Sequence, residues 1–369
     1  MADFPSIRIT IPTFNAVADI DRTLDSIAAQ SYQQECIFTL IVDFGSTDGT
    51  IEKILARMGK RLGLMQLPHA RWGRTAAATA WKQNPLQMTP GIPLTLEQGD
   101  CLYDDALRRL VEFQRTARKY VRQPNLLVVT DVDTRLYDGS VQKSTPLYTR
   151  PCLFRAYTDD SIAFVERGGQ QRMLSFGVSP LPQCDKGATL FNQRSWWSSL
   201  SAYAMVGTIA YLPEALCIRN AEGKLDDPLD DILFRLDNVI TLDRMVQDNP
   251  EVYVLGRQYD ACARRQLALY SLWRASQAAE QKAMRDAEDC FLMARVIDNT
   301  VTEEPIWEEM QDFFAGKPHA DLEKIVARRE RCESPAEPRW PLPRNCWEEL
   351  TFRLRRLLSH DRHTALAER

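Results

Sequence analysis

Residues 7–15 read Ile-Arg-Ile-Thr-Ile-Pro-Thr-Phe-Asn, and residues 40–50 read Leu-Ile-Val-Asp-Phe-Gly-Ser-Thr-Asp-Gly-Thr. Each stretch begins with β-branched and apolar residues, typical of a buried strand, and ends in turn-forming polar residues. Between them, Ile20, Leu24 and Ile27 recur at the spacing of one helix face. A strand, a helix and a second strand in this order indicate a β-α-β unit, and therefore a parallel sheet.

The same alternation continues outward from these stretches through the first half of the chain. Apolar runs predict further strands at 63–67, 92–96, 126–129 and 208–212, and helices at 51–58, 75–82 and around 107–111. Sheets of this kind bind ligands beyond the carboxyl ends of their strands. Polar clusters at 13–15, 43–48 and 97–100 each follow a strand directly, so we expect them to converge on one edge of the sheet.

The second half of the chain reads differently. From about residue 225 the sequence is charged and poor in glycine, and it predicts helices at 233–245, 267–295 and 347–357, with a proline-rich break at 334–343. A length of 369 residues is also compatible with about two domains. We therefore expect an α/β domain at 1–224 and a helical C-terminal region at 225–369.

Composition excludes several classes of protein. With 44% apolar and 26% charged residues the chain is an ordinary globular one, and its net charge of −4 argues against a nucleic-acid partner. The nine cysteines are scattered without a C-x-x-C pair, so neither a zinc site nor a disulfide framework is expected. The sequence begins without a recognisable signal peptide, which predicts a cytoplasmic protein.

The two quoted stretches, at their spacing, resemble the opening of family 2 inverting glycosyltransferases, which have the GT-A fold. The similarity continues through Gly73-Arg74, through 97–107 and through 210–216, and covers about the first 220 residues. It implies an enzyme that transfers a sugar with inversion from a nucleotide-sugar to a hydroxyl acceptor. A UDP-sugar is the favoured donor, and the acceptor would belong to a surface polysaccharide, a glycolipid or a glycosylated metabolite.

The resemblance implies a donor site built from strand-end residues: Pro12, Thr13, Phe14, Asn15, Asp43, Arg74, Gly99 and Asp100. Phe14 would lie beside the nucleoside, and Asp43, at an exposed strand end, would accept a hydrogen bond from the base. Arg74 would face the base or the phosphates. Asp100 would hold Mg²⁺ or Mn²⁺, which neutralises the departing diphosphate. Each feature also has a structural interpretation: residues 12–15 form a strand-ending turn, and residues 46–49 cap the next helix.

The sequence departs from the family pattern at its acids. Phe44 replaces the second polar residue of the first motif, and residues 97–100 keep only the last of the usual clustered aspartates. The candidate catalytic base is Asp185, which could equally be a loop acid paired with Lys186. Two other acidic pairs are weaker candidates for these roles. The D-x-D at Asp131 and Asp133 comes one strand too late for the family's metal motif. Asp230 and Asp231 follow the 210–216 segment, whereas the family's acidic pair precedes it.

These departures keep a rival function open, namely a GT-A-like protein that binds a nucleotide-sugar without turnover. A nucleotidyltransferase fits the two motifs less well. The last predicted helix carries an apolar stripe of Trp347, Leu350, Leu354 and Leu357 beside Arg353, Arg355 and Arg356. This stripe either packs on the α/β domain or on a second subunit in a homo-oligomer, or lies on the inner face of a membrane as a peripheral contact. Packing is the favoured expectation.

Overall fold

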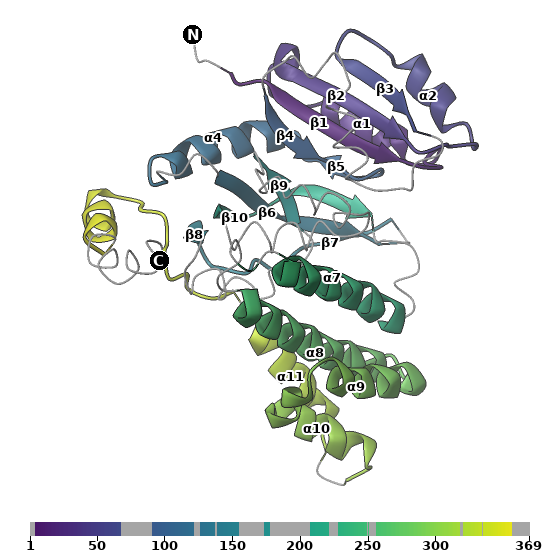
Figure 1. Cartoon of the computed structure of the whole chain (residues 1–369), viewed down its shortest axis with the longest axis vertical. Helices are drawn as coiled ribbons and strands as arrows, with labels where there is room; N and C mark the ends of the chain where they lie inside the picture. Colours follow the sequence, from purple (N-terminus) through teal and green to yellow (C-terminus); the bar gives the residue numbers. More distant parts are fainter. Residues whose placement is uncertain are drawn as a thin grey trace.

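The computed structural model describes residues 4–67, 91–121, 126–136, 139–154, 173–177, 207–220, 228–248, 250, 256–317, 320–333 and 335–355. Figure 1 shows a sheet with helices packed against it in one half of the molecule, and a stack of helices in the other. The mixed α/β class, with a mostly parallel sheet flanked by helices and a helical C-terminal region, is therefore confirmed.

Four parallel strands form the first half of the sheet, in the order β3-β2-β1-β4. They are β1 (Ile7–Thr13), β2 (Ile37–Asp43), β3 (Leu62–Gln66) and β4 (Ile92–Thr95), close to the predicted ranges. In the register of β1 and β2, Thr13 lies opposite Asp43, so both strands end at the same level. This shared end is what brings their loops together.

The second half of the sheet contains the long strands β6 (Leu126–Arg135) and β10 (Thr208–Asn220), which are parallel to each other. The antiparallel strand β9 (Met173–Phe176) joins β4 to β6, and β5 (Cys101–Leu102) pairs antiparallel with β10. The short strands β7 (Val141–Gln142) and β8 (Cys152–Phe154) pair with β6 and β10. None of β5, β7, β8 and β9 was predicted.

Helices cover both faces of the sheet (Figure 1). On one face, α1 (Ile20–Ala28) and α4 (Ala106–Arg118) bury their apolar stripes in a core that includes Ile9, Ile41 and Val128, while α2 (Thr50–Ala56) packs beside α1. On the other face, Val129 and Tyr211 of the sheet share a core with Leu267 of the helical region. The helical region is therefore joined to the sheet by a common apolar core.

The helical region consists of α7 (Pro228–Asp248), α8 (Gly256–Glu280), α9 (Met284–Ile297), α10 (Pro305–Phe314) and α11 (Leu322–Glu333). Short 3₁₀ turns occur at Gln34–Cys36 and Asn299–Glu303. The single long helix predicted at 267–295 is wrong, because the chain turns at Lys282 (φ 63°) and divides it into α8 and α9. Within the described residues, no helix is long and apolar enough to cross a membrane.

The end of the described chain returns to the sheet domain. Backbone hydrogen bonds join Ala336 to Leu147 and Thr149, and join Leu153 to Trp340. Residues 346–355 then form a helix that packs near the end of α4, where the Phe352 ring meets Tyr120 and Trp340 edge-on.

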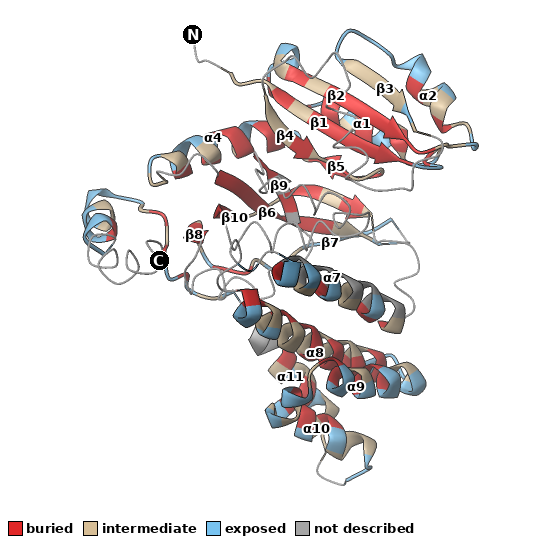
Figure 2. Cartoon of the chain, viewed as in Figure 1, coloured by how far each residue is buried: buried red, intermediate tan, exposed pale blue. Residues whose placement is uncertain are grey.

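The face that this final helix presents to the protein differs from the prediction. Phe352 is buried, whereas Trp347, Leu350 and Leu354 of the predicted packing stripe are exposed. In Figure 2 the helix at the left of the view is coloured mostly as exposed. The expectation that this stripe packs on the α/β domain is wrong. The reason is that the single phenylalanine on the opposite face fits the core at Trp340. Leu357 and Arg356 lie outside the described residues.

Candidate functional site

The loops that follow β1 and β2 are tied together by side-chain caps. Asn15 donates its backbone N–H to Ser46 Oγ at 2.9 Å, and its Oδ1 accepts from the Thr47 N–H at 2.9 Å. Asp48 accepts from the Val17 N–H at 3.0 Å, and also from Thr50 at the start of α2. Asn15 adopts a left-handed backbone (φ 47°), a conformation that asparagine tolerates better than most residues. The first two loops therefore form one unit.

The loop after β4 joins this unit through Gln98. Its Oε1 accepts from the Phe14 N–H at 2.8 Å, and its Nε2 donates to the Phe14 carbonyl at 3.1 Å. The amide thus binds both polar groups of Phe14 and leaves the ring about half exposed. The predicted convergence of the three loops on one edge of the sheet is confirmed. Gln98 was not among the predicted site residues, because nothing in its sequence position marks it as a backbone clamp.

Asp43 lies inside this loop unit and not at an exposed strand end, as was expected. Its side chain is fully buried, and its Oδ2 accepts from the N–H groups of Gly45 and Ser46 at 2.9 and 3.0 Å. Its Oδ1 accepts from the Ser46 hydroxyl. These three bonds hold the turn after β2, and two of them satisfy backbone N–H groups that lie beyond the end of the strand. Of the predicted 12–15 segment, Pro12 and Thr13 are likewise buried in β1, and only Phe14 and Asn15 reach the surface.

Asp100 is held inside the domain by an ion pair. Its two carboxylate oxygens accept from Arg219 Nε and Nη2 at 2.8–3.1 Å, and Oδ2 also accepts from the Glu97 N–H at 3.0 Å. Both side chains are almost completely buried. A carboxylate with these partners is not available to a cation on the surface, so the geometry does not support the predicted metal ligand.

Gly99, beside Asp100, has a backbone that suits only glycine. Its φ of 88° is disfavoured for other residues, and a Cβ there would overlap Asn220 Nδ2. A metal-binding side chain cannot be carried at this position. Within the described part of the chain, no group of three or more His, Cys, Asp or Glu side chains could hold a metal ion. The residues described here therefore do not fit the Mg²⁺ or Mn²⁺ site that the resemblance implies.

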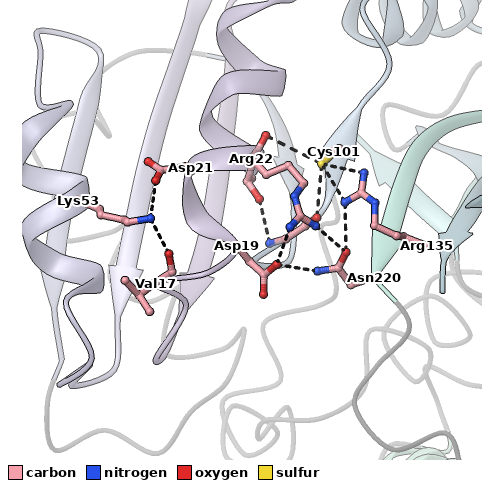
Figure 3. A network of polar contacts seen from close by, with 10 residues as sticks. Val17, Asp19, Asp21, Arg22, Lys53, Cys101, Arg135 and Asn220 are labelled. Atoms are coloured by element: carbon pink, nitrogen blue, oxygen red, sulfur yellow. Dashed lines mark hydrogen bonds and ion pairs between the residues drawn. The ribbon is translucent and has the colours of Figure 1, made fainter. Parts of the chain in front are cut away.

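Two arginines flank this loop (Figure 3). Arg22, from the first turn of α1, and Arg135, from the end of β6, both point at Asn220 Oδ1, at 3.5 and 3.4 Å. Arg22 also pairs with Asp19 at 3.4 Å, and Arg135 donates to Cys101 Sγ at 3.7 Å. Burial raises the pKa of Cys101, so its thiol stays neutral. This part of the edge therefore carries two guanidinium groups, beside the carboxylates of Asp19 and Glu97.

Asp131 and Asp133 are two residues apart in β6 and therefore lie on the same face of the strand, and both are buried. Asp131 accepts from the Tyr211 hydroxyl at 2.7 Å, and the same hydroxyl accepts from the Leu147 N–H at 2.8 Å. Burial raises the pKa of Asp131 to about 7, and the nearby charge of Asp133 adds to this effect. Asp131 is therefore a carboxyl group that is only partly ionised at neutral pH.

Asp133 has stronger partners. It accepts from Tyr103 Oη at 2.5 Å, from Lys143 Nζ at 2.8 Å and from the Ser144 N–H at 2.9 Å. Burial opposes its ionisation, but the hydrogen bonds from Lys143 and Tyr103 hold its pKa below the usual value. The two acids of the D-x-D thus have separate protein partners, and their weaker weight as metal ligands stays a prediction.

Two predicted site residues, Arg74 and Asp185, lie outside the described residues. The side chains of Asp230 and Asp231 also lie outside them, although their backbone belongs to α7. The roles assigned to these residues therefore stay predictions.

The described structure defines an α/β protein whose hydrogen-bonded loops meet beyond the carboxyl ends of parallel strands, the place where such sheets bind ligands.

No protein-family model matches the chain, and no curated protein matches it. Among solved structures, the chain is similar to residues 1–349 of S. aureus TarS in complex with UDP-GlcNAc, with 13% identity, a TM-score of 0.46, and coverage of 81% of this chain and 92% of that one. The structure of TarS 1–349 without a named ligand gives the same identity and TM-score, with 91% of that chain covered. The chain is also similar to the mannosyltransferase PcManGT from Pyrobaculum calidifontis in complex with GDP-Man and Mn²⁺, with 13% identity, a TM-score of 0.45, and coverage of 90% of this chain and 88% of that one.

Proposed function

We propose that this chain is a glycosyltransferase of the GT-A type that uses a nucleotide-sugar donor, with a UDP-sugar favoured. The observation that carries the proposal is the joined loop surface at the ends of β1, β2 and β4, on which Phe14 is presented by Gln98. This surface lies where the sequence resemblance requires the donor. Inversion, and an acceptor hydroxyl from a surface polysaccharide, a glycolipid or a glycosylated metabolite, are parts of the proposal that rest on the resemblance.

In this proposal the described residues bind the donor's nucleoside. The exposed Phe14 ring offers a flat apolar face, and stacking of a nucleobase on such a ring contributes about 1–3 kcal/mol. Asp43 acts indirectly, because its bonds to Gly45 and Ser46 set the shape of the turn that borders the base. Asn15 joins the two loops and fixes the direction of the Phe14 peptide.

The chemical step would be a single displacement at the anomeric carbon. The acceptor oxygen forms a bond to that carbon while the bond to the diphosphate oxygen breaks, and the acceptor's proton passes to a base, for which Asp185 is the candidate. The departing diphosphate gains negative charge, and Arg22 and Arg135 place positive charge beside the loop that would hold it. A divalent cation would supply the same neutralisation, but the described residues do not form a site for it.

A second candidate function is a protein that binds a nucleotide-sugar without transferring the sugar. The observation in its favour is the structure of the loop 97–100. Asp100 forms a buried ion pair with Arg219, and a side chain at position 99 would overlap Asn220. Turnover separates the two functions: release of nucleoside diphosphate from a panel of sugar donors and acceptors favours the transferase, and tight binding without release favours the binding protein.

The test is titration calorimetry of UDP and GDP against the full chain, with and without Phe14→Ala. Loss of stacking predicts a dissociation constant about 5–160-fold larger for the variant. Met58→Ala is the matched control, because Met58 is 44% exposed and Phe14 is 43% exposed, while Met58 lies after α2 and away from the joined loops. No binding of either nucleotide to the unchanged protein, or equal effects of the two variants, would contradict the proposed site.

A further inference from the structure

The helix formed by residues 346–355 presents an unusual face to solvent. Trp347 is 78% exposed, and Leu350 and Leu354 are 49% and 50% exposed. At 3.6 residues per turn these three side chains fall within an arc of about 60° on one side of the helix. Phe352 lies on the opposite side and is buried against Tyr120 and Trp340. The apolar stripe is therefore turned outward by the packing of the helix itself.

The helix is fixed in this orientation by contacts on its inner side. Glu348 accepts from Arg150 Nη2 at 2.6 Å and from the Arg344 N–H at 3.0 Å. Arg150 also donates to the Leu342 carbonyl at 2.9 Å, so the helix is linked to the strand-like segment that precedes it. These contacts, together with the Phe352 anchor, hold Trp347 and the two leucines away from the domain.

The charges around the stripe are unequal. The two acids, Glu348 and Glu349, are half-buried and accept from Arg150 and Arg353. Arg344, just before the helix, and Arg355 at its end are exposed, and residues 344–355 with three arginines and two glutamates have a net charge of +1. A large indole with two leucines and a basic border is the composition of a helix that lies in the interface of an anionic membrane. A second copy of this chain would present the same net charge to this segment, whereas an anionic lipid surface presents the opposite charge.

We propose that residues 346–355 form a docking surface for an anionic lipid bilayer, with the stripe of Trp347, Leu350 and Leu354 inserted among the headgroups. Phe352, which packs against Tyr120 and Trp340, attaches this helix to the sheet domain. Membrane binding through this face would therefore hold the whole protein as a peripheral body on the lipid surface. The inference is independent of the proposed transferase activity, because no residue of the joined loops takes part in it.

The test is co-sedimentation of the full chain with vesicles of phosphatidylcholine and phosphatidylglycerol, compared with phosphatidylcholine alone, at low salt. The unchanged protein is expected to sediment with the anionic vesicles only. The double variant Leu350→Glu/Leu354→Glu is expected to stay in the supernatant. Leu292→Glu/Val296→Glu on α9 is the matched control, since these residues have the same spacing and are 59% and 75% exposed, and it is expected to bind like the unchanged protein.

A separate variant tests the contribution of the arginine charge to binding of the anionic vesicles. Arg355→Gln removes one exposed charge and is expected to weaken binding to the anionic vesicles about fivefold. Because all substituted side chains are exposed, unchanged melting temperatures verify that the fold is intact. Failure of the unchanged protein to bind anionic vesicles, or equal loss of binding in both glutamate pairs, overturns the proposal. A dimer in sedimentation velocity that Leu350→Glu/Leu354→Glu dissociates also overturns it, because the stripe would then be a contact between copies.

Discussion

Asp100 shows how the partner of a residue decides its role. The sequence pattern places it in a loop where an aspartate would bind a metal ion, but its carboxylate is neutralised by a guanidinium 119 positions away in the chain. Removal of one member of a buried ion pair leaves the other charge uncompensated, whereas replacement of both by apolar groups is often tolerated. The interpretation as a structural ion pair therefore makes a different prediction from the interpretation as a metal ligand.

We expect Asp100→Asn to lower the free energy of unfolding by about 3–5 kcal/mol, because Arg219 stays charged and buried. The double variant Asp100→Leu/Arg219→Met is expected to recover most of this loss. Urea denaturation of the three proteins measures both effects. An Asn variant as stable as the unchanged protein, but with impaired binding of a divalent cation, would restore the interpretation as a metal ligand.

The raised pKa of Asp131 makes the stability of the protein depend on pH. In the unfolded chain an aspartate has a pKa of about 3.9, whereas burial raises the folded value to about 7. The folded protein therefore holds a proton that the unfolded chain releases. The contribution of this proton to the free energy of unfolding is complete below a pH of about 3.9. It decreases as the pH rises from there and is lost as the pH rises through about 7. The full effect is roughly 4 kcal/mol.

Asp131→Asn keeps an acceptor for Tyr211 but cannot ionise. We expect the free energy of unfolding of the unchanged protein to fall between pH 5 and pH 8 by more than that of the variant. Denaturant titrations at the two pH values measure this difference, and Asp133→Asn is the comparison. Asp133 has a pKa held low by Lys143 and Tyr103, so its replacement should cost stability at both pH values. Parallel pH profiles of unchanged protein and Asp131→Asn would contradict the raised pKa.

At the scale of elements, the sequence predicted what depends on periodicity and strand ends. Strands such as 7–11 and helices such as 20–27 have enough apolar residues at the right spacing to specify one element, and their order specifies a parallel sheet. The convergence of the loops followed from that topology alone. The short strands β5 and β7 have two residues each, which is too few for any periodic signal.

Other elements could not be predicted because their determinants are not local. The break between α8 and α9 falls at Gln281–Ala283, where the sequence has neither glycine nor proline to mark it. The orientation of the final helix depends on one phenylalanine that meets Trp340, although the opposite face carries more apolar surface. The clamp by Gln98 and the ion pair of Asp100 likewise depend on partners that only the folded chain brings close.

The whole molecule is connected through the sheet. Strands β6 and β10 contribute one face to the core of α1 and α4, and the other face to the core of α7, α8 and α9. The predicted division into 1–224 and 225–369 rests on a change in amino-acid composition along the chain. In the structure, the apolar cores on the two faces of the sheet both contain residues of β6 and β10. A segment from beyond residue 335 also returns to the sheet domain. We therefore expect the described parts to unfold together.

Leu267→Ala tests this cooperativity. Leu267 of α8 is completely buried in the core that includes Val129 and Tyr211, so its truncation should lower the free energy of unfolding by about 2–5 kcal/mol. If unfolding is cooperative, the slowest-exchanging backbone amides of β1 and of α8 should both exchange faster in the variant, by the same free-energy decrement. Val296→Ala is the control, since Val296 is exposed on α9 and its truncation should leave both sets of amides unchanged. Faster exchange confined to α8 would show instead that the helical region opens by itself, because β1 would then keep its protection while the shared core is weakened.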